Sequence, residues 1–257
     1  MRPQRLMQIE DYIRKEKTVS LEAICREFNI SLSTLRRDLK TITRNGSFAK
    51  VYGGITLGSE TLRRPFVERH VDNPEAKRLI GRAAAALVAD GDVIYIDSGT
   101  TTMYMADYLG ERQNLTVLTH NFEVISRTLP HENITLVALG GALNRQVHSF
   151  FSESAVADLK RYNIAKAFTA TAGISEKYGV THSFLAEYSI KKAAVDHARQ
   201  VILLADHSKI DRVATHTYCG LEDIDMLITD EPVPESFAAA LSEHHCRLKI
   251  AGADGEQ

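Results

Sequence analysis

The stretch VIYIDSGTTTMYMADYLG, residues 93–110, decides the fold of this chain. Its first four residues are apolar or aromatic, and such a run is typical of a strand that is covered on both faces of a sheet. Asp97, Ser98, Gly99 and three threonines come next, and a helical pattern then resumes. A strand, a polar turn and a helix in this order predict an α/β unit with a ligand-facing turn.

The same alternation recurs through the rest of the chain. Apolar runs predict strands at 93–96, 115–118, 134–139, 165–170, 201–205, 226–229 and 247–250. Helical patterns lie at 101–109, 122–129, 154–162, 185–199 and 235–243. Strands that alternate with helices predict a doubly wound, mostly parallel α/β domain, in which ligands bind beyond the carboxyl ends of the strands.

The beginning of the chain differs in charge from the remainder. Residues 1–58 hold eleven Lys and Arg against six Asp and Glu, a net charge of +5, whereas the rest holds 20 basic and 27 acidic residues. Leu6, Ile9 and Ile13 predict a first amphipathic helix, and Ser20 and Ser31 are suitable N-caps for two more. This basic segment is therefore a candidate domain for binding a polyanion.

The third predicted helix, LSTLRRDLKTI at 32–42, carries two different faces. On a helical wheel Leu32, Leu35, Leu39 and Ile42 form the packing face. The opposite face presents hydroxyl and cationic side chains, namely Ser33, Arg36, Arg37 and Lys40, and Thr34 flanks it. The pattern is typical of the second helix of a helix-turn-helix, although an isolated cationic face is also compatible with plain solvation.

The sequence also predicts how this helix is supported and which element comes after it. Asp38 borders the apolar stripe, and we interpret it as the structural partner of a nearby cation. Residues 48–57 predict a hairpin that reverses at Gly53-Gly54, a wing whose Lys50 reaches backbone phosphate. We therefore expect a winged helix-turn-helix at 1–58, a linker at 59–73 and an α/β effector-binding and oligomerisation domain at 74–251, with Asn73 as the N-cap of its first helix.

The polar turn after residue 96 suits an anionic ligand. Gly99 allows close approach of the backbone, and amides at the start of the following helix favour an anion. Lys209, after the strand at 201–205, supplies a cation, whereas Asp97 is better suited to sugar hydroxyls. A simple helix cap is the alternative interpretation of the same residues.

The chain resembles the DeoR family of bacterial transcriptional regulators. The motifs that carry the resemblance are SLSTLRRDL and YGGI in the first domain, and IDSGTTT, THN, LGGALN, AGIS, AEYSIKKA and ADHSK in the second. The resemblance implies a sensor domain similar in fold to ribose-5-phosphate isomerase. It also implies effector contacts at or near Asp97, Gly99, Thr100, Thr101, Asn121, Gly140, Gly141, Glu187, Lys191 and Lys209.

We accordingly expect a repressor of a carbohydrate-utilisation operon that binds double-stranded operator DNA and is released by a phosphorylated sugar or polyol. One helix-turn-helix reads few base pairs, so a homo-oligomer, dimer or tetramer, is expected. A sugar-phosphate isomerase-like enzyme is the alternative, and a second domain that only oligomerises is another.

Other features of the sequence bear on cofactors and cell compartment. We expect no cofactor and no metal, because His244, His245 and Cys246 lack a third ligand at suitable spacing. The three cysteines lie far apart and no apolar run has the length of a membrane span, so the expected compartment is the cytoplasm, without membrane contact.

Overall fold

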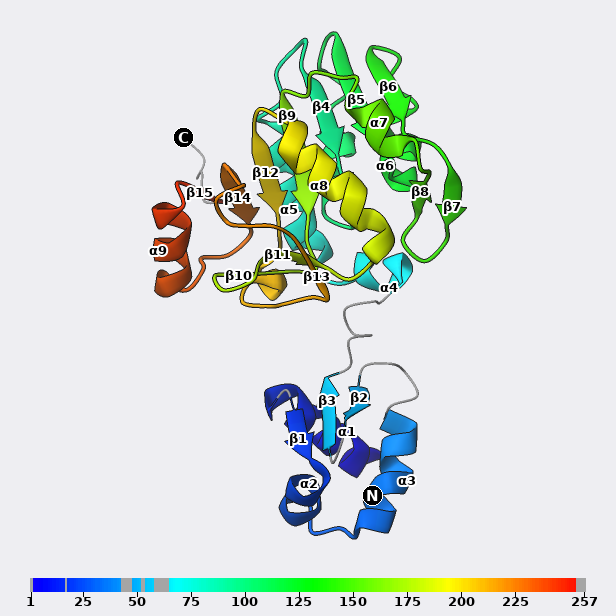
Figure 1. The fold of residues 1–257 in the computed structure, drawn as a ribbon, viewed down its shortest axis with the longest axis vertical. Coiled ribbons are helices and arrows are strands. Elements are labelled where there is room, and N and C mark those ends of the chain that lie inside the picture. Colours follow the sequence, from blue (N-terminus) through cyan, green and yellow to red (C-terminus); the bar gives the residue numbers. More distant parts are fainter. Residues whose placement is uncertain (1, 17, 43–47, 52–53, 58–64, 253–257) are drawn as a thin grey trace. The chain divides into compact units, whose positions relative to one another are not determined.

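The computed structural model describes residues 2–16, 18–42, 48–51, 54–57 and 65–252. The chain divides into two compact units, Met1–Arg64 and Pro65–Gln257 (Figure 1). None of the described helices is long and apolar enough to cross a membrane.

The first unit packs three helices against a small antiparallel sheet. The helices are α1 (Arg2–Glu16), α2 (Leu21–Glu27) and α3 (Leu32–Ile42), and the strands are β1 (Thr18–Ser20), β2 (Phe48–Val51) and β3 (Gly54–Leu57). Ile9, Ile13, Ile24, Leu35 and Leu39 form its core. The predicted winged helix-turn-helix is confirmed in the described residues, whereas the predicted turn residue Gly53 lies outside them.

Strand β1 was not predicted, and a glycine explains how it fits. The strand order is β1-β3-β2, with Ser20 opposite Gly54. A Cβ at Gly54 would lie 2.7 Å from the carbonyl oxygen of Val19, so only glycine permits this close pairing. The predicted N-cap of α2 is confirmed, because Ser20 Oγ accepts a hydrogen bond from the backbone N–H of Ala23 at 3.1 Å.

The second unit is built on one seven-stranded parallel sheet, as predicted. Its strand order is β15-β14-β12-β9-β4-β5-β6, and every neighbouring pair is parallel. The bounds are β4 (Val93–Ile96), β5 (Leu115–Thr119), β6 (Ile134–Ala138), β9 (Lys166–Ala170), β12 (Val201–Leu204), β14 (Met226–Thr229) and β15 (Arg247–Ile250). The order reverses between β4 and β9, and such a switch point is where open α/β sheets bind ligands.

Helices cover both faces of this sheet (Figure 1). They are α4 (Phe66–His70), α5 (Pro74–Ala85), α6 (Phe122–Thr128), α7 (Ala155–Leu159), α8 (Tyr188–His197) and α9 (Glu235–Glu243), with 3-10 turns η3 (Thr102–Tyr108), η4 (Leu185–Glu187) and η5 (His207–Lys209). Ile94 and Ile96 pack with α5 and η3 on one face. Tyr95 points to the other face and packs with α7 and α8.

Two further sheets, which the sequence analysis did not predict, extend from the carboxyl ends of the main strands. One pairs β7 (Ala142–Asn144) with β8 (Ser149–Phe151), and the other orders β10 (Gly173–Ser175), β11 (Gly179–His182) and β13 (His216–Cys219). These strands are three or four residues long, too short to show a periodicity.

Three local expectations for the second unit differ from the structure. Residues 65–73 are not a linker, since they contain α4 and Phe66 is buried in the main core. Asn73 lies at the N-cap position of α5 as predicted, but its backbone is left-handed and its side chain donates to Asp206 Oδ1 at 3.2 Å instead of capping the helix. The segment after the turn at 97–101 is a seven-residue 3-10 helix rather than an α-helix from Thr101.

Candidate nucleic-acid interface and candidate sensor site

Helix α3 presents the predicted polar face to solvent. Ser31 Oγ accepts from the backbone N–H of Thr34 at 3.3 Å and caps the helix. Ser33, Arg36 and Arg37 are exposed and Thr34 is half-buried, whereas Leu35, Leu39 and Ile42 are buried. Leu32 is 40% exposed and does not join the packing face, since it lies at the open first turn. Lys40 lies on α3 and Lys50 on β2, but their side chains fall outside the described residues.

Asp38 holds α3 against α1. Its carboxylate is buried, and Asp38 Oδ2 accepts from Arg5 Nε at 2.9 Å and pairs with Arg5 Nη2 at 2.8 Å. This confirms the interpretation of Asp38 as the structural partner of a cation. The pair fixes the rotation of α3, and hence the direction of its cationic face.

The carboxyl ends of β4 and β9 meet at a buried ion pair. Lys191, from α8, contacts Asp97 Oδ2, and both side chains are inaccessible to solvent. The backbone N–H of Ala170 donates to the same oxygen at 2.9 Å, and Tyr95 Oη donates to Asp97 Oδ1 at 3.3 Å. Lys191 also donates to the carbonyl of Ala170 at 3.2 Å. The charge of Asp97 is thus balanced within the protein.

A second polar group lies at the start of α8. Glu187 is buried, accepts from Ser98 Oγ at 2.8 Å and contacts His182 Nε2. Burial by itself would raise the pKa of Glu187, but His182 and Lys191 lower it below the usual range. Burial, together with the charge of Lys191, lowers the pKa of His182, and burial likewise lowers that of His120. The lowered pKa values favour neutral imidazoles at pH 7, and that of Glu187 favours its carboxylate.

The turn between Asp97 and η3 offers backbone donors. No backbone N–H of residues 98–101 donates to another residue in the described ranges. Thr102 Oγ1 donates to the Asp97 carbonyl at 2.8 Å and Asn121 Nδ2 to the Gly99 carbonyl at 3.5 Å, which turns these oxygens inward. A Cβ at Gly99 would lie 2.5 Å from Ala170 Cβ, so the turn requires glycine. Buried N–H groups need a partner, and an anion supplies one.

The remaining predicted effector residues follow other strands of the sheet, β6 and β12. Gly141 has φ +137, and a Cβ there would lie 2.1 Å from the Phe151 carbonyl oxygen. The geometry of the β7–β8 hairpin therefore explains why this residue is glycine. Gly140 is exposed and has open space around it. Lys209 comes after β12, where its Nζ lies 3.6 Å from Asp206 Oδ2, and burial lowers its pKa. The structure thus gathers Asp97, Gly99, Thr100, Thr101, Asn121, Glu187 and Lys191, and it sets Gly140, Gly141 and Lys209 at other strand ends.

Four residues of this site were missed by the sequence analysis. Tyr95 and His120 lie in or directly after predicted strands, and their rings stack with centroids 6.0 Å apart. His182 and Ser183 lie at the end of β11, a strand that was not predicted. Of the four, only His120 lies in a motif that was singled out as polar, THN, and there Asn121 was selected as the effector contact instead.

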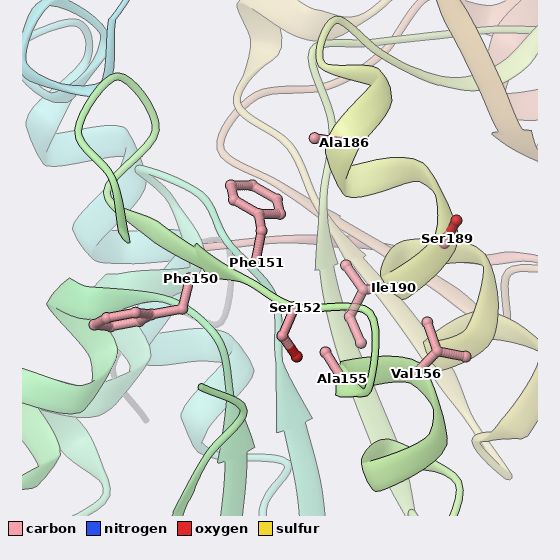
Figure 2. A pocket seen from close by; sticks show the side chains of 8 residues that line it. All are labelled: Phe150, Phe151, Ser152, Ala155, Val156, Ala186, Ser189 and Ile190. Carbon is pink, nitrogen blue, oxygen red and sulfur yellow. The ribbon is translucent and has the colours of Figure 1, made fainter. Parts of the chain in front are cut away.

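A small pocket opens beside these groups. Phe151, Ala155, Ala186 and Ile190 contribute to its lining, between β8, α7 and α8 (Figure 2). Phe151 also meets the ring of His120 edge-on, with centroids 6.2 Å apart. The pocket is therefore adjacent to the polar groups at the ends of β4 and β5.

A winged helix-turn-helix joined to an α/β unit with a polar site at its switch point defines the class of ligand-sensing, DNA-binding regulators. Residues 5–61 match the DeoR-like helix-turn-helix domain, and residues 72–231 match the DeoR C-terminal sensor domain. The chain belongs to the DeoR family of transcriptional regulators.

Similar proteins span the whole chain. The HTH-type transcriptional regulator IolR of Bacillus subtilis is 36% identical over 98% of this chain and 100% of its own length. The transcriptional repressor GlcR of the same organism is 30% identical over 98% and 97%, and the glycerol-3-phosphate regulon repressor of Escherichia coli is 27% identical over 96% and 98%. These full-length relatives are regulators, so the isomerase-like enzyme considered as an alternative was wrong.

Solved structures give more distant similarities. A D-ribose-5-phosphate isomerase in complex with phospho-erythronic acid has a TM-score of 0.41 and 17% identity, over 53% of this chain and 54% of that one. The ribose-5-phosphate isomerase A of Methanocaldococcus jannaschii has a TM-score of 0.41 and 21% identity, over 54% and 55%.

Proposed function

We propose that this regulator represses a carbohydrate- or polyol-utilisation operon and releases its operator when a phosphorylated sugar or polyol binds at the carboxyl ends of β4, β5 and β9. The observation that carries the effector site is the turn at 98–101, where the backbone amides of consecutive buried residues lack partners among the described residues. Backbone N–H groups of this kind donate hydrogen bonds to the oxygen atoms of a phosphate group.

The DNA-binding part of the proposal rests on α3. Ser33, Thr34, Arg36 and Arg37 lie on its outer face, and Lys40 and Lys50 are the further proposed contacts. Arginine side chains at such positions read guanine or hold phosphate. We propose that the protein acts in the cytoplasm, because it would have to reach operator DNA there.

The regulatory part requires two copies of the chain. One helix-turn-helix reads a half-site, so we infer a dimer or tetramer that joins through the second unit. The effector releases DNA if it binds more tightly to an arrangement whose helices no longer match the spacing of the half-sites. The names of the relatives GlcR and the glycerol-3-phosphate regulon repressor support repression.

A thermal-shift screen of the full chain against sugar and polyol phosphates tests the effector. A ligand that binds only the folded state raises the melting temperature by an amount that grows with its concentration over Kd. The matched variant is Gly99→Ala, whose methyl group would displace the turn from Ala170. We expect Gly99→Ala to bind operator DNA normally and to lose the ligand shift. A wild-type chain that responds to no probe would favour the alternative that the second unit only oligomerises.

A further inference from the structure

Four buried polar atoms near the site form no hydrogen bond in the described parts of the chain. They are His120 Nε2, both ring nitrogens of His182 and Ser183 Oγ, and each side chain is more than nine-tenths buried. Of these, His182 Nε2 still has a charged neighbour, because it contacts the carboxylate of Glu187. Buried polar atoms in proteins are nearly always hydrogen-bonded, so several unpaired atoms in one place indicate a missing ligand or water.

Hydrogen bonding fixes which nitrogen of His120 is the acceptor. The single proton of Tyr95 Oη is donated to Asp97, and His120 Nδ1 lies 3.1 Å from the same hydroxyl oxygen. In the hydrogen bond between these two atoms, His120 Nδ1 is therefore the donor and Tyr95 Oη the acceptor. In a neutral imidazole the other nitrogen, Nε2, is then an acceptor.

The same reasoning applies to His182. Its Nε2 faces the carboxylate of Glu187, which accepts hydrogen bonds and donates none when ionised. Nε2 therefore carries the proton, and the unpaired Nδ1 is an acceptor. The site thus contains two unpaired acceptors that need hydrogen-bond donors. The adjacent Ser183 hydroxyl can act as a donor or as an acceptor.

The local charge excludes phosphate from these atoms. Two buried carboxylates, those of Asp97 and Glu187, lie here beside a single buried ammonium group, that of Lys191, which contacts Asp97. Phosphate oxygens are acceptors and would face a carboxylate and two nitrogen lone pairs. A hydroxyl group donates a hydrogen bond and carries no charge, so it fits where phosphate does not.

We propose that His120 Nε2, His182 Nδ1 and Ser183 Oγ bind hydroxyl groups of the effector, at the end of the molecule remote from its phosphate. This inference rests on the proposed function and adds the orientation of the ligand. The phosphate lies at the turn of residues 98–101, and the hydroxyl-bearing end points to the imidazoles. The pocket beside Phe151, whose ring meets His120, supplies the adjacent opening (Figure 2).

Two substitutions remove the unpaired acceptors and retain the existing contacts. His120→Asn keeps an amide near the position of Nδ1, beside Tyr95, and deletes Nε2. His182→Gln keeps an amide near the position of Nε2, beside Glu187, and deletes Nδ1. The matched control is His148→Asn, which keeps the contact of Nδ1 with Glu123 Oε1 (2.8 Å) and lies at a left-handed position that Asn tolerates.

The experiment measures melting temperatures of the full chain alone and with glycerol 3-phosphate, ribose 5-phosphate, fructose 1-phosphate, inositol 1-phosphate or inorganic phosphate. For the probe that protects the wild type best, we expect His120→Asn and His182→Gln to bind about tenfold more weakly, as for the loss of one hydrogen bond. Any protection by inorganic phosphate should be unchanged. Without probe, neither variant should melt below the His148→Asn control.

The outcomes separate this inference from the proposed function. Wild-type affinity for the sugar phosphate in both variants would overturn the inference and leave the proposed function intact. Loss of protection by inorganic phosphate, or a lower melting temperature than the control without probe, would also overturn it, because the atoms would then have another role. A wild-type chain that no probe protects would overturn the proposed effector, and the inference with it.

Discussion

Lys191 and Asp97 form an ion pair in which neither side chain has accessible surface. The pair joins α8 to the end of β4, directly before the turn at 98–101. Removal of one partner from a buried pair leaves an uncompensated charge, which is more costly than replacement of both. The pair is therefore a sensitive probe of the packing beneath the sensor site.

We predict that Lys191→Met lowers the free energy of unfolding of the second unit by about 3–5 kcal/mol. The double variant Lys191→Met, Asp97→Asn should recover part of this loss, because no buried charge is then left unpaired. Urea unfolding followed by circular dichroism measures both. Equal stability of the single and double variants would contradict the role of the pair.

A second prediction concerns the orientation of α3. Asp38→Asn removes the charge that Arg5 contacts at 2.8 Å and should lower the stability of the first unit by about 1–3 kcal/mol. Because α3 loses its attachment to α1, affinity for operator DNA should fall at temperatures where the unit is still folded. Fluorescence anisotropy with a labelled operator measures the affinity, and Glu22→Gln on α2 is the exposed control. Unchanged affinity and stability would contradict this role.

A third prediction tests the cationic face itself. Arg36→Ala with Arg37→Ala should abolish specific DNA binding without loss of stability, since both side chains are exposed. The slope of log affinity against log salt should become less negative by about 0.9 for each phosphate contact removed. Arg161→Ala, on the surface of the second unit, is the control. A salt slope equal to that of the wild type would exclude these arginines as phosphate contacts.

The fold was largely predictable because its signals are local and redundant. The inner strands of the main sheet are covered on both faces, so runs such as 93–96 and 226–229 stand out without knowledge of their neighbours. Likewise Leu35 and Leu39 share one face of α3 in any helix. The short strands β1 and β10 escaped prediction because their pairing depends on distant residues, as Gly54 shows for β1.

The site was predictable only in part, for a related reason. The turn with Gly99 carries its own signature of a strand followed by small and polar residues. Lys191 and Glu187 were selected by resemblance, but their partners Asp97 and His182 come from elements 94 and 5 residues away along the chain. His182 lies on an unpredicted strand, so nothing in its neighbourhood distinguished it from a surface histidine.

A fourth prediction concerns the anchor of the second unit. Phe66 stacks on His148 with ring centroids 4.7 Å apart, and its backbone N–H donates to the Gln146 carbonyl at 2.7 Å. Phe66→Ala should destabilise the second unit by about 3 kcal/mol, because a buried ring leaves a cavity. Amide exchange at residues 145–151 should become faster. The adjacent Val67→Ala, at an exposed position, should change neither quantity, and equal effects of the two variants would contradict the anchor.

The last prediction uses the pH dependence of stability. Lys77 is buried, and its Nζ donates to the carbonyls of Arg69 at 2.6 Å and Asp72 at 2.5 Å, which holds α5 to the segment after α4. Burial lowers the pKa of Lys77 from 10.5 to about 8. Between these values the unfolded chain binds one more proton than the folded chain, so this residue makes stability rise with pH, by about 1.4 kcal/mol per pH unit.

Lys77→Met should remove this contribution. The variant should be less stable than the wild type, because the two carbonyls lose their donor, and the difference should widen as pH rises from about 8 to about 10. Lys209, whose pKa is also lowered by burial, interacts with the charge of Lys77, so the same comparison is repeated in a Lys209→Met background. Unfolding at several pH values in this range measures the difference. A constant difference would mean that Lys77 keeps its ordinary pKa, and that the ammonium group is solvated in the folded protein.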